Sequence, residues 1–315
     1  MKKLIKETDY FSLYLLSDGV YAPIAKPGKG AWSNAGFVDL GDEVIVFDAF
    51  STPSAAHELR FQAEEITGKK VKYLVNSHYH GDHTFGNQAF SDTTIISTSL
   101  TRQLNEEKNR IGDLEKEQEE MQQYLLQLKT QIEAEEEQII KSSLINQYNE
   151  MSKVLEDLPK MKIVLPSVLF EDKVVIEGSQ RKVELHCLGG GHTPSDSFMY
   201  LPEERIAFMG DLVTESLHLP LYDPESFLSI LNKVIQMEIE TFVPGHGNIG
   251  NKGLVDDLIG YLTLLIEKAK EAHLHQKSLE DFLKEFQMPV LYKEWKGVNG
   301  INRNLLQVYN FYKTF

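Results

Sequence analysis

Three histidines and one aspartate lie within a single stretch of six residues. The stretch follows the apolar run Val71 to Val75 and reads His78-Tyr79-His80-Gly81-Asp82-His83. Imidazole nitrogen and carboxylate oxygen are ligands of Zn²⁺ and its first-row neighbours. Side chains two residues apart on an extended chain point the same way, so His78 and His80 can hold one ion. Gly81 lets the backbone turn, after which Asp82 and His83 face another direction. The spacing therefore predicts two neighbouring metal ions.

Two metal ions need more ligands than this stretch offers, and further candidates occur later in the chain. Each of them stands at the C-terminal end of an apolar run with a glycine close before it: His192, Asp211 and His246. Asp48 ends a similar apolar run, Val44 to Phe47. Because the C-terminal ends of strands form the ligand-binding edge of an α/β sheet, we expect these side chains to meet there.

These residues resemble the metallo-β-lactamase-fold hydrolases, whose hallmark is H-x-H-x-D-H followed by a distant His, an Asp and a final His. The later elements occur here in that order, as Gly191-His192-Thr193-Pro194, Met209-Gly210-Asp211 and Pro244-Gly245-His246-Gly247. The resemblance covers roughly residues 17 to 250. It implies an α/β fold of four layers, an αββα sandwich with a dinuclear site at one edge.

The resemblance also implies a role for each residue. Three histidines would hold the first ion: His78, His80 and His192. One carboxylate and two histidines would hold the second: Asp82, His83 and His246. Asp211 would bridge the two ions, as in the glyoxalase II and lactonase branches. Asp48 would steady the loop of the motif without touching metal, and Asp196 would act in the same way or as a helix-type cap.

The expected chemistry follows from this ligand set. Two dications a few ångströms apart lower the pKa of a shared water to about 7, which gives a metal-bridging hydroxide near neutral pH. Asp82 is the expected catalytic residue, because its carboxylate would orient the hydroxide and handle its proton. This predicts a zinc-dependent hydrolase of an ester, thioester, lactone or amide of a small metabolite. Two Zn²⁺ are the expected cofactors, with iron or manganese as alternatives.

Departures from the patterns of the family leave other functions open. In lactamases with a cysteine at the bridging position, a lysine three residues later binds the drug; those positions are Asp211 and Thr214 here, which argues against a β-lactamase. An iron-dependent oxidoreductase stays open, because the persulfide dioxygenase branch keeps the histidines. A third alternative is an interaction protein with a structural metal site. Structural sites are closed by protein ligands, whereas this set leaves a position for water.

Three aromatic or imidazole side chains are candidate substrate contacts. Trp32 lies in a Gly/Pro-rich stretch and could be a flap over the metals or the tip of a hairpin. His218 and Tyr222 follow Asp211, where the loops of the family border the site, and packing is the alternative for both.

Residues 100 to 160 interrupt the pattern of the family. Gly112 is their only glycine and Pro159 their only proline, which predicts long helix. Apolar residues follow the spacing of a coiled-coil seam: Leu104, Ile111, Leu114, Met121, Leu125, Leu128, Ile132 and Ile139. Such a stripe needs a partner. The partner is either the same segment of a second subunit in a homodimer or the second half folded back as a hairpin, through Leu144, Ile145, Tyr148, Met151 and Leu155. A lid over the metals is a further role.

The domain organisation follows from where the ligands fall in the 315 residues. Since the ligands must meet in one fold, we expect a catalytic domain over residues 1–250, interrupted by the helical insertion at 100–160. Residues 251–315 are expected to form a helical extension that packs on the same domain. Its helices are expected from about Gly253 to His275, Ser278 to Phe286 and Ile301 to Tyr312.

Charge and hydropathy bear on partners and location. The net charge of −15 and a pI of about 5.2 argue against a nucleic-acid partner, because phosphate backbones need basic surfaces. The N-terminus has no apolar signal core, and the longest apolar stretch is too short for a membrane span. We therefore expect a small-molecule substrate, no membrane partner and a cytoplasmic location.

Overall fold

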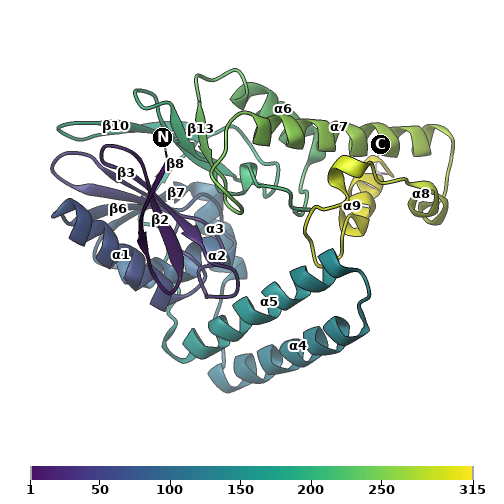
Figure 1. The fold of residues 1–315 in the computed structure, drawn as a ribbon, viewed down its shortest axis with the longest axis horizontal. Coiled ribbons are helices and arrows are strands. Elements are labelled where there is room, and N and C mark those ends of the chain that lie inside the picture. The colour runs from purple at the N-terminus through teal and green to yellow at the C-terminus, as the bar shows by residue number, and fades with distance from the viewer. Residues whose placement is uncertain (1, 314–315) are drawn as a thin grey trace.

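Two β-sheets face each other in the computed structural model, which describes residues 2–313 (Figure 1). The first sheet has eight strands in sequence order: β1 (Lys3–Glu7), β2 (Phe11–Ser17), β3 (Val20–Ala25), β4 (Gly36–Asp39), β5 (Val44–Phe47), β6 (Val71–Val75), β7 (Thr94–Thr98) and β8 (Val168–Phe170). The second has five, in the order β13 (Thr241–Val243), β12 (Ile206–Phe208), β11 (Ser197–Leu201), β10 (Lys182–Cys187) and β9 (Lys173–Glu177).

Helices cover the outer faces of both sheets and extend the chain beyond them. The α-helices are α1 (Pro53–Thr67), α2 (Gly81–Thr84), α3 (Ser99–Lys108), α4 (Leu114–Ala134), α5 (Gln138–Asp157), α6 (Pro224–Val234), α7 (Gly253–Leu274), α8 (Leu279–Glu285) and α9 (Asn302–Lys313). Short 3₁₀ helices occur at Phe85–Phe90, Leu158–Lys160, Gly210–Leu212 and Val290–Tyr292.

Three apolar clusters separate four layers. Leu59 of α1 packs with Phe37 beneath the outer face of the first sheet. Val75 and Phe208 belong to the cluster between the two sheets, and Leu262 of α7 belongs to the cluster on the outer face of the second. Each fully buried side chain of this size contributes about 1.5–3 kcal/mol to folding. The predicted αββα sandwich is confirmed.

Parallel pairing places the C-terminal ends of neighbouring strands at one edge of each sheet. Strands β5 to β8 pair in parallel, and every residue of β5 is buried, which explains its uninterrupted apolar run. In the second sheet β12 and β13 are also parallel. The chain therefore leaves β5, β6, β12 and β13 close to the residues that the motif singles out.

The insertion forms three helices rather than one long helix. Helix α3 ends at Lys108, and α4 starts only after Asp113, whose side chain caps it by accepting from the Lys116 backbone N–H at 3.1 Å. Ile111 lies in the break between these helices, Leu104 lies before it in α3, and Ile139 lies in α5, so the predicted continuous seam is wrong at these three residues.

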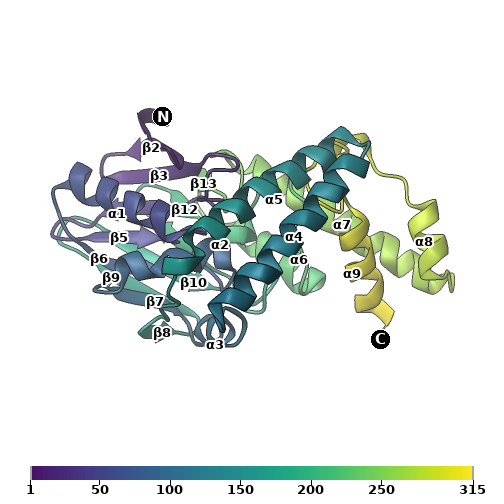
Figure 2. The ribbon, with the colours of Figure 1, turned by 90° about the horizontal axis from the view of Figure 1, so that it is seen from below.

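Helices α4 and α5 pack side by side as an antiparallel hairpin, here called the arm (Figure 2). Leu125, Leu128 and Leu144 are buried between them. This agrees with the hairpin alternative, although Ile145 is 42% exposed and does not join the seam as expected. Pairing of arms between two subunits stays a prediction.

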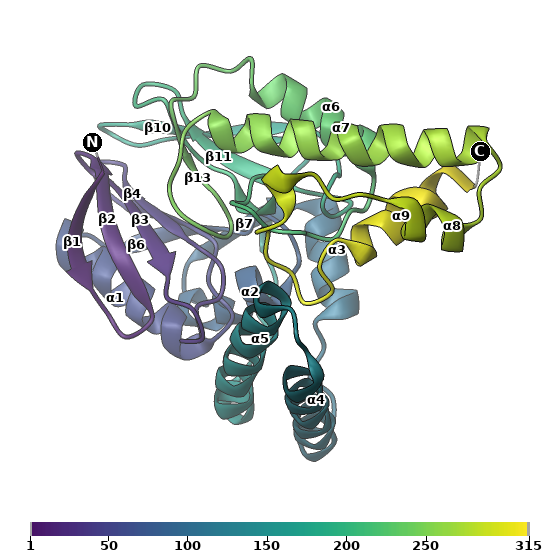
Figure 3. The same cartoon turned by 45° about the vertical axis from the view of Figure 1, so that its right-hand side comes forward.

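The C-terminal helices begin and end within about a residue of the expected bounds. Ser278 caps α8 through a 3.1 Å hydrogen bond from the Asp281 backbone N–H to its hydroxyl. Helices α7, α8 and α9 share an apolar cluster with α6 and the second sheet, and lie at the far side from α1 (Figure 3). Within residues 2–313, no helix has both the length and the apolar character needed to cross a membrane.

Candidate metal centre

Seven side chains from four separate segments converge at one edge of the sandwich. They follow β6, β10, β12 and β13, and form two groups of potential ligands. The first group contains His78, His80, His192 and Asp211, and the second contains Asp82, His83 and His246. The structure therefore brings together all the residues that the motif singled out as ligands, in the two groups that the resemblance implies.

The first group surrounds a point with three nitrogens and one oxygen. His80 Nδ1 lies 3.1 Å from His78 Nε2 and 3.0 Å from His192 Nε2. Asp211 Oδ2 lies 3.3 Å from His192 Nε2 and 3.9 Å from His78 Nε2. Such a set of ligand atoms suits a four-coordinate ion.

The second group has one carboxylate and two imidazoles, and Asp211 of the first group also reaches its centre. Asp82 Oδ2 lies 3.2 Å from His246 Nε2 and 3.5 Å from His83 Nε2. Asp211 Oδ1 lies 3.3 Å from His83 Nε2 and 3.4 Å from His246 Nε2. Asp211 thus presents one oxygen to each group, which is the arrangement of a bridging carboxylate.

Hydrogen bonds on the outer side of the rings fix which nitrogen faces each centre. His192 Nδ1 donates to the Pro220 carbonyl at 2.9 Å, and His246 Nδ1 donates to the Trp32 carbonyl at 3.2 Å. His83 Nδ1 lies 2.8 Å from Asp48 Oδ2. Since a carbonyl or carboxylate oxygen only accepts, the proton lies on Nδ1, and Nε2 of the neutral ring carries a lone pair directed at the centre.

Asp48 also fixes which nitrogen of His78 faces the centre, through the Ser77 hydroxyl. The Ser77 hydroxyl donates its one proton to Asp48 Oδ2 at 2.8 Å, so it must accept from His78 Nδ1 at 2.9 Å. The other Asp48 oxygen accepts from the Ser77 backbone N–H at 2.8 Å. Asp48 has a φ of 62°, which is rare for a residue with a side chain and marks a constrained position. Asp48 therefore contacts the motif loop and orients rings of both groups.

Two buried ligand atoms have no hydrogen-bond partner. They are His83 Nε2 and Asp211 Oδ1, both at the centre of the second group. Buried polar atoms without a partner are rare in proteins, and cations between the ligands would satisfy both atoms. The residues present therefore fit two divalent ions, and the nitrogen and oxygen donors suit Zn²⁺ and its first-row neighbours alike.

The histidines of the two groups differ in pKa. Burial, reinforced by neighbouring rings, lowers the pKa of His78 well below its usual value and that of His80 to about 4. Burial would also lower the pKa of His246, but the carboxylates of Asp211 and Asp82 raise it to about 10. The pKa of His83 is raised well above its usual value by the same acids and Asp48, against its burial.

Asp196 shapes the turn that carries His192. Its carboxylate accepts from the backbone N–H groups of Gly191 at 3.0 Å, His192 at 2.9 Å and Thr193 at 3.0 Å. Burial raises the pKa of Asp196 to about 6. Asp196 belongs to neither ligand group, so its contacts are with the loop and not with the centre.

The three candidate substrate contacts lie in different surroundings. Trp32, in the loop between β3 and β4, contacts the outer nitrogen of His246 through its backbone carbonyl. His218 is buried, its Nδ1 lies 2.8 Å from the Tyr261 hydroxyl and its ring packs near Trp295, which is the packing alternative. Tyr222 is 59% exposed, and its backbone N–H donates to the Gly191 carbonyl at 2.9 Å, so it borders the loop of His192. Substrate contact by Trp32 or Tyr222 stays a prediction.

The loop of residues 28–34, here called the strap, holds the second group through Ser33 and Asn34, neither of which was predicted from the sequence. Ser33 Oγ donates to the Asp82 carbonyl at 2.6 Å. The Asn34 amide donates to the carbonyls of Pro244 at 2.8 Å and Gly247 at 2.9 Å, on both sides of His246. These partners are backbone carbonyls far along the chain. Contacts of this kind leave no local sequence motif by which they could be predicted.

Comparisons with known proteins agree with the fold. The structure resembles a metallo-beta-lactamase from Pontibacter korlensis with a TM-score of 0.54 and 17% identity, over 84% of this chain and 99% of that chain. It resembles the stereoselective inverting sec-alkylsulfatase Pisa1 from Pseudomonas sp. with a TM-score of 0.70 and 14% identity, over 96% of this chain and 50% of the sulfatase. A double mutant of that sulfatase gives a TM-score of 0.69. At such identities the likeness concerns the fold alone.

Sequence comparison identifies the family. A search of curated proteins finds no match. The family description that matches is "Metallo-beta-lactamase superfamily", over residues 32–246, a range that covers more than half of the chain and contains both ligand groups. On this match, and on the sandwich that carries the ligands, the chain belongs to the metallo-beta-lactamase superfamily.

Proposed function

We propose that the protein is a dinuclear metal-dependent hydrolase that cleaves an ester, thioester, lactone or amide of a small metabolite, with Zn²⁺ in both ligand groups. One observation carries the proposal. Asp211 presents one carboxylate oxygen to each group, while rings whose Nδ1 is hydrogen-bonded outward direct Nε2 at both centres. Two ions so placed would supply hydroxide as a nucleophile near neutral pH and would polarise the group under attack.

Exposure indicates where a substrate would approach. The side chains of His78, His83, His192 and Asp211 are at most 3% exposed, whereas Asp82 is 19% and His246 is 15% exposed. His80 is also only partly buried. The centre is therefore reached from solvent past these last three ligands. A solvent-facing ligand set favours catalysis over a structural site or an interaction protein, because structural metal sites are closed.

Asp82 is the proposed catalytic residue. Burial by itself would raise its pKa, but the imidazoles of His83 and His246 lower it to about 2. The carboxylate thus stays ionised near neutral pH, where it can orient an attacking water by accepting its hydrogen bond and then receive its proton. Its exposure leaves one side of the carboxylate accessible to that water and to substrate.

Antibiotic hydrolysis is disfavoured by Thr214. This position, three residues after Asp211, carries no cation, and its side chain is only 2% exposed. It offers nothing that could bind the carboxylate of a β-lactam. We expect kcat/KM for a lactone or thioester to exceed that for every penicillin, cephalosporin and carbapenem. A carbapenem turned over better than all lactones and thioesters would reverse the ranking.

A substrate panel on protein purified without added metal tests the proposal. It should contain carboxylic esters, thioesters, lactones and amides, and secondary alkyl sulfates in view of the sulfatase that shares the fold. We expect metal-dependent hydrolysis of at least one carbonyl class, abolished by a chelator and restored by Zn²⁺. One tightly held iron with oxygen consumption on a persulfide would instead establish the iron-dependent oxidoreductase.

A further inference from the structure

A buried carboxylate connects the arm to the strap. Glu150 of α5 is 1% exposed, although the arm around it is largely exposed. Its Oε1 accepts from the Gly28 backbone N–H at 2.6 Å, and its Oε2 accepts from the Gly30 backbone N–H at 2.8 Å. Burying a carboxylate is costly unless it is hydrogen-bonded, so both contacts are needed for this position to be tolerated.

The strap and the arm are matched in shape at this point. A Cβ at Gly28 would lie 2.8 Å from Asn149 Cβ, and one at Gly30 would lie 3.1 Å from Lys153 Cβ. Both glycines have left-handed backbone, with φ of 72° and 95°. Only glycine therefore lets the strap lie this close to α5 with its N–H groups turned toward Glu150.

The other end of the strap contacts the second ligand group. The Trp32 carbonyl fixes the His246 ring, Ser33 holds the Asp82 backbone, and Asn34 binds the loop of His246. Two histidines of the first group have their outer partners elsewhere, with His78 on Ser77 and His192 on Pro220. A displacement of the strap would therefore change the second group and spare the first.

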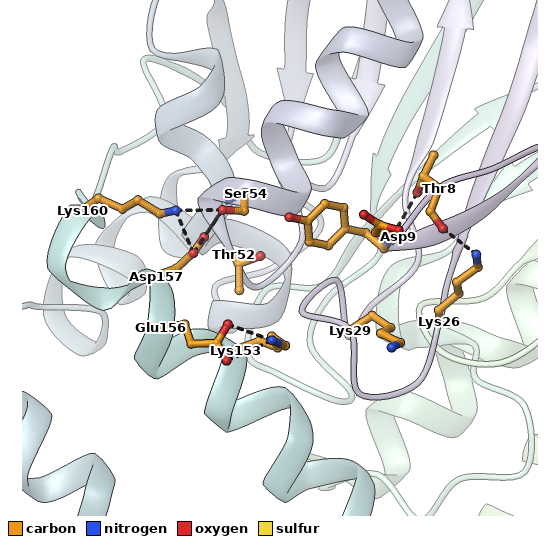
Figure 4. A pocket seen from close by; sticks show the side chains of 11 residues that line it. Thr8, Asp9, Lys26, Lys29, Thr52, Ser54, Lys153, Glu156, Asp157 and Lys160 are labelled. Carbon is orange, nitrogen blue, oxygen red and sulfur yellow. Dashed lines mark hydrogen bonds and ion pairs between the residues drawn. The ribbon is translucent and has the colours of Figure 1, made fainter.

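The outer flank of the strap faces open space. A cavity of about 750 Å³ lies between the strap and the base of α5, lined in part by Lys26, Lys29, Thr52 and Lys153 (Figure 4). Lys153 is paired with Glu156 of its own helix at 2.8 Å. The segment before α1 also holds the strap, because the Gly30 carbonyl accepts from Ser51 Oγ at 2.9 Å and from Thr52 Oγ1 at 2.7 Å. On the side of the arm, the strap is held by the hydrogen bonds to Glu150.

Helix α5 is itself fixed at both ends. Near its C-terminus, Asp157 accepts from the Ser54 backbone N–H at 2.8 Å and from the Ser54 hydroxyl at 3.0 Å, at the start of α1. Near its N-terminus, the Ser143 hydroxyl accepts from the Gly297 backbone N–H at 3.0 Å. The arm thus spans from the sandwich to the C-terminal loop and presents Glu150 from a fixed support.

We propose that Glu150 is a positioning residue for the metal centre: the arm presents its carboxylate to the strap, and the strap sets the geometry of Asp82 and His246. This inference rests on the proposed two-metal function. The arm would thereby support the second ligand group of its own chain.

Metal titration of variants tests the proposal by a readout other than activity. The affinities of the first and second Zn²⁺ are measured by chelator competition for the wild type, Glu150→Ala, Glu150→Gln and the control Glu156→Gln, with circular dichroism as the check of folding. Glu156 is an acid of the same helix that does not contact the strap. We expect Glu150→Ala to weaken the second ion by about 10–100-fold and to leave the first within about twofold.

The other variants refine the result. Glu150→Gln should fall between Glu150→Ala and the wild type, because its amide oxygen can accept one N–H while its NH₂ cannot accept the other. Gly30→Ala approaches the same contact from the strap and should weaken the second ion selectively, which keeps the test valid if Glu150→Ala does not fold. Glu156→Gln should match the wild type.

Two results would overturn the inference while leaving the proposed function intact. One is equal weakening of both ions by Glu150→Ala and Gly30→Ala, and the other is unchanged binding of both ions in these variants. A wild-type protein that binds no second ion would overturn the proposed function and the inference together, and that failure is visible before any variant is made.

Discussion

The two ligand groups share Asp211 but differ in charge. The first adds three imidazoles to that carboxylate, whereas the second adds two imidazoles and the carboxylate of Asp82. Burial favours neutral rings in both groups, yet the pKa of His80 is lowered to about 4 while that of His246 is raised to about 10. Neighbouring carboxylates thus decide the protonation of rings that are buried in both groups. Without metal, the first group is ready to bind an ion, and the second must first give up protons.

The groups also differ in what holds them. His78 is fixed by the adjacent Ser77, and His192 by Pro220, 28 residues away. His246 is fixed by Trp32, 214 residues away, in a strap whose Gly28 and Gly30 donate to Glu150 of the arm. We therefore expect mutations elsewhere in the molecule to affect the second group before the first.

The largest effect is expected from Asp211→Ala, because this residue belongs to both groups. Without the shared carboxylate, neither set of imidazoles has its full complement of ligands. We expect metal content to fall from about two ions to fewer than one per chain, with no measurable hydrolysis. Elemental analysis decides this, and His57→Ala, an exposed position, serves as the unaffected control. Retention of both ions would show that Asp211 does not bridge.

Asp82→Asn should affect chemistry more than the first ion. The amide can occupy the same space but cannot accept the proton of water, so turnover should fall by about 10²–10⁴-fold. The fold and the first ion should persist, which circular dichroism and metal titration can follow. Wild-type hydrolysis in this variant would remove Asp82 from the role proposed here.

Asp48→Asn should distinguish the groups by a smaller margin. Asp48 contacts His83 directly and reaches His78 only through Ser77. We expect affinity for the second ion to fall by about 10–100-fold and affinity for the first to fall less. Competition with a chelator measures both values. Equal losses would mean that Asp48 supports the two groups alike.

Proton release gives the subtlest contrast. In the metal-free protein at pH 7, His80 is neutral because its pKa is about 4, while His246 holds a proton because its pKa is about 10. A metal needs the neutral ring, so the first ion should release almost no protons and the second about one or more. Affinity for the second ion should rise with pH from 7 toward about 10. Calorimetry in buffers of different ionisation enthalpy measures the release, and equal values for both ions would refute the contrast.

The sequence predicted which side chains converge, because each of them follows a strand at one edge of the sandwich. The metal motif, the αββα layers and the Ser278 cap all depend on local patterns, which a sequence displays directly. The strap and Glu150 could not be predicted, since their hydrogen bonds join backbone groups to residues more than 100 positions away. Glu150 is one of many acids in the arm, and only its burial distinguishes it. Ile111 fitted a heptad, but a helix break removes it from the seam. Ile145 was expected to pack as part of the second half of the hairpin, but it lies on an exposed face.

Metal analysis of the purified wild-type protein tests the central claim most directly. Elemental analysis and stepwise titration, on protein prepared without added metal, count the ions that each chain holds and show whether two classes of site exist. The account predicts about two zinc or zinc-like ions per chain, bound in two distinguishable steps. A single tightly held ion per chain, iron in particular, with no second binding step would contradict it.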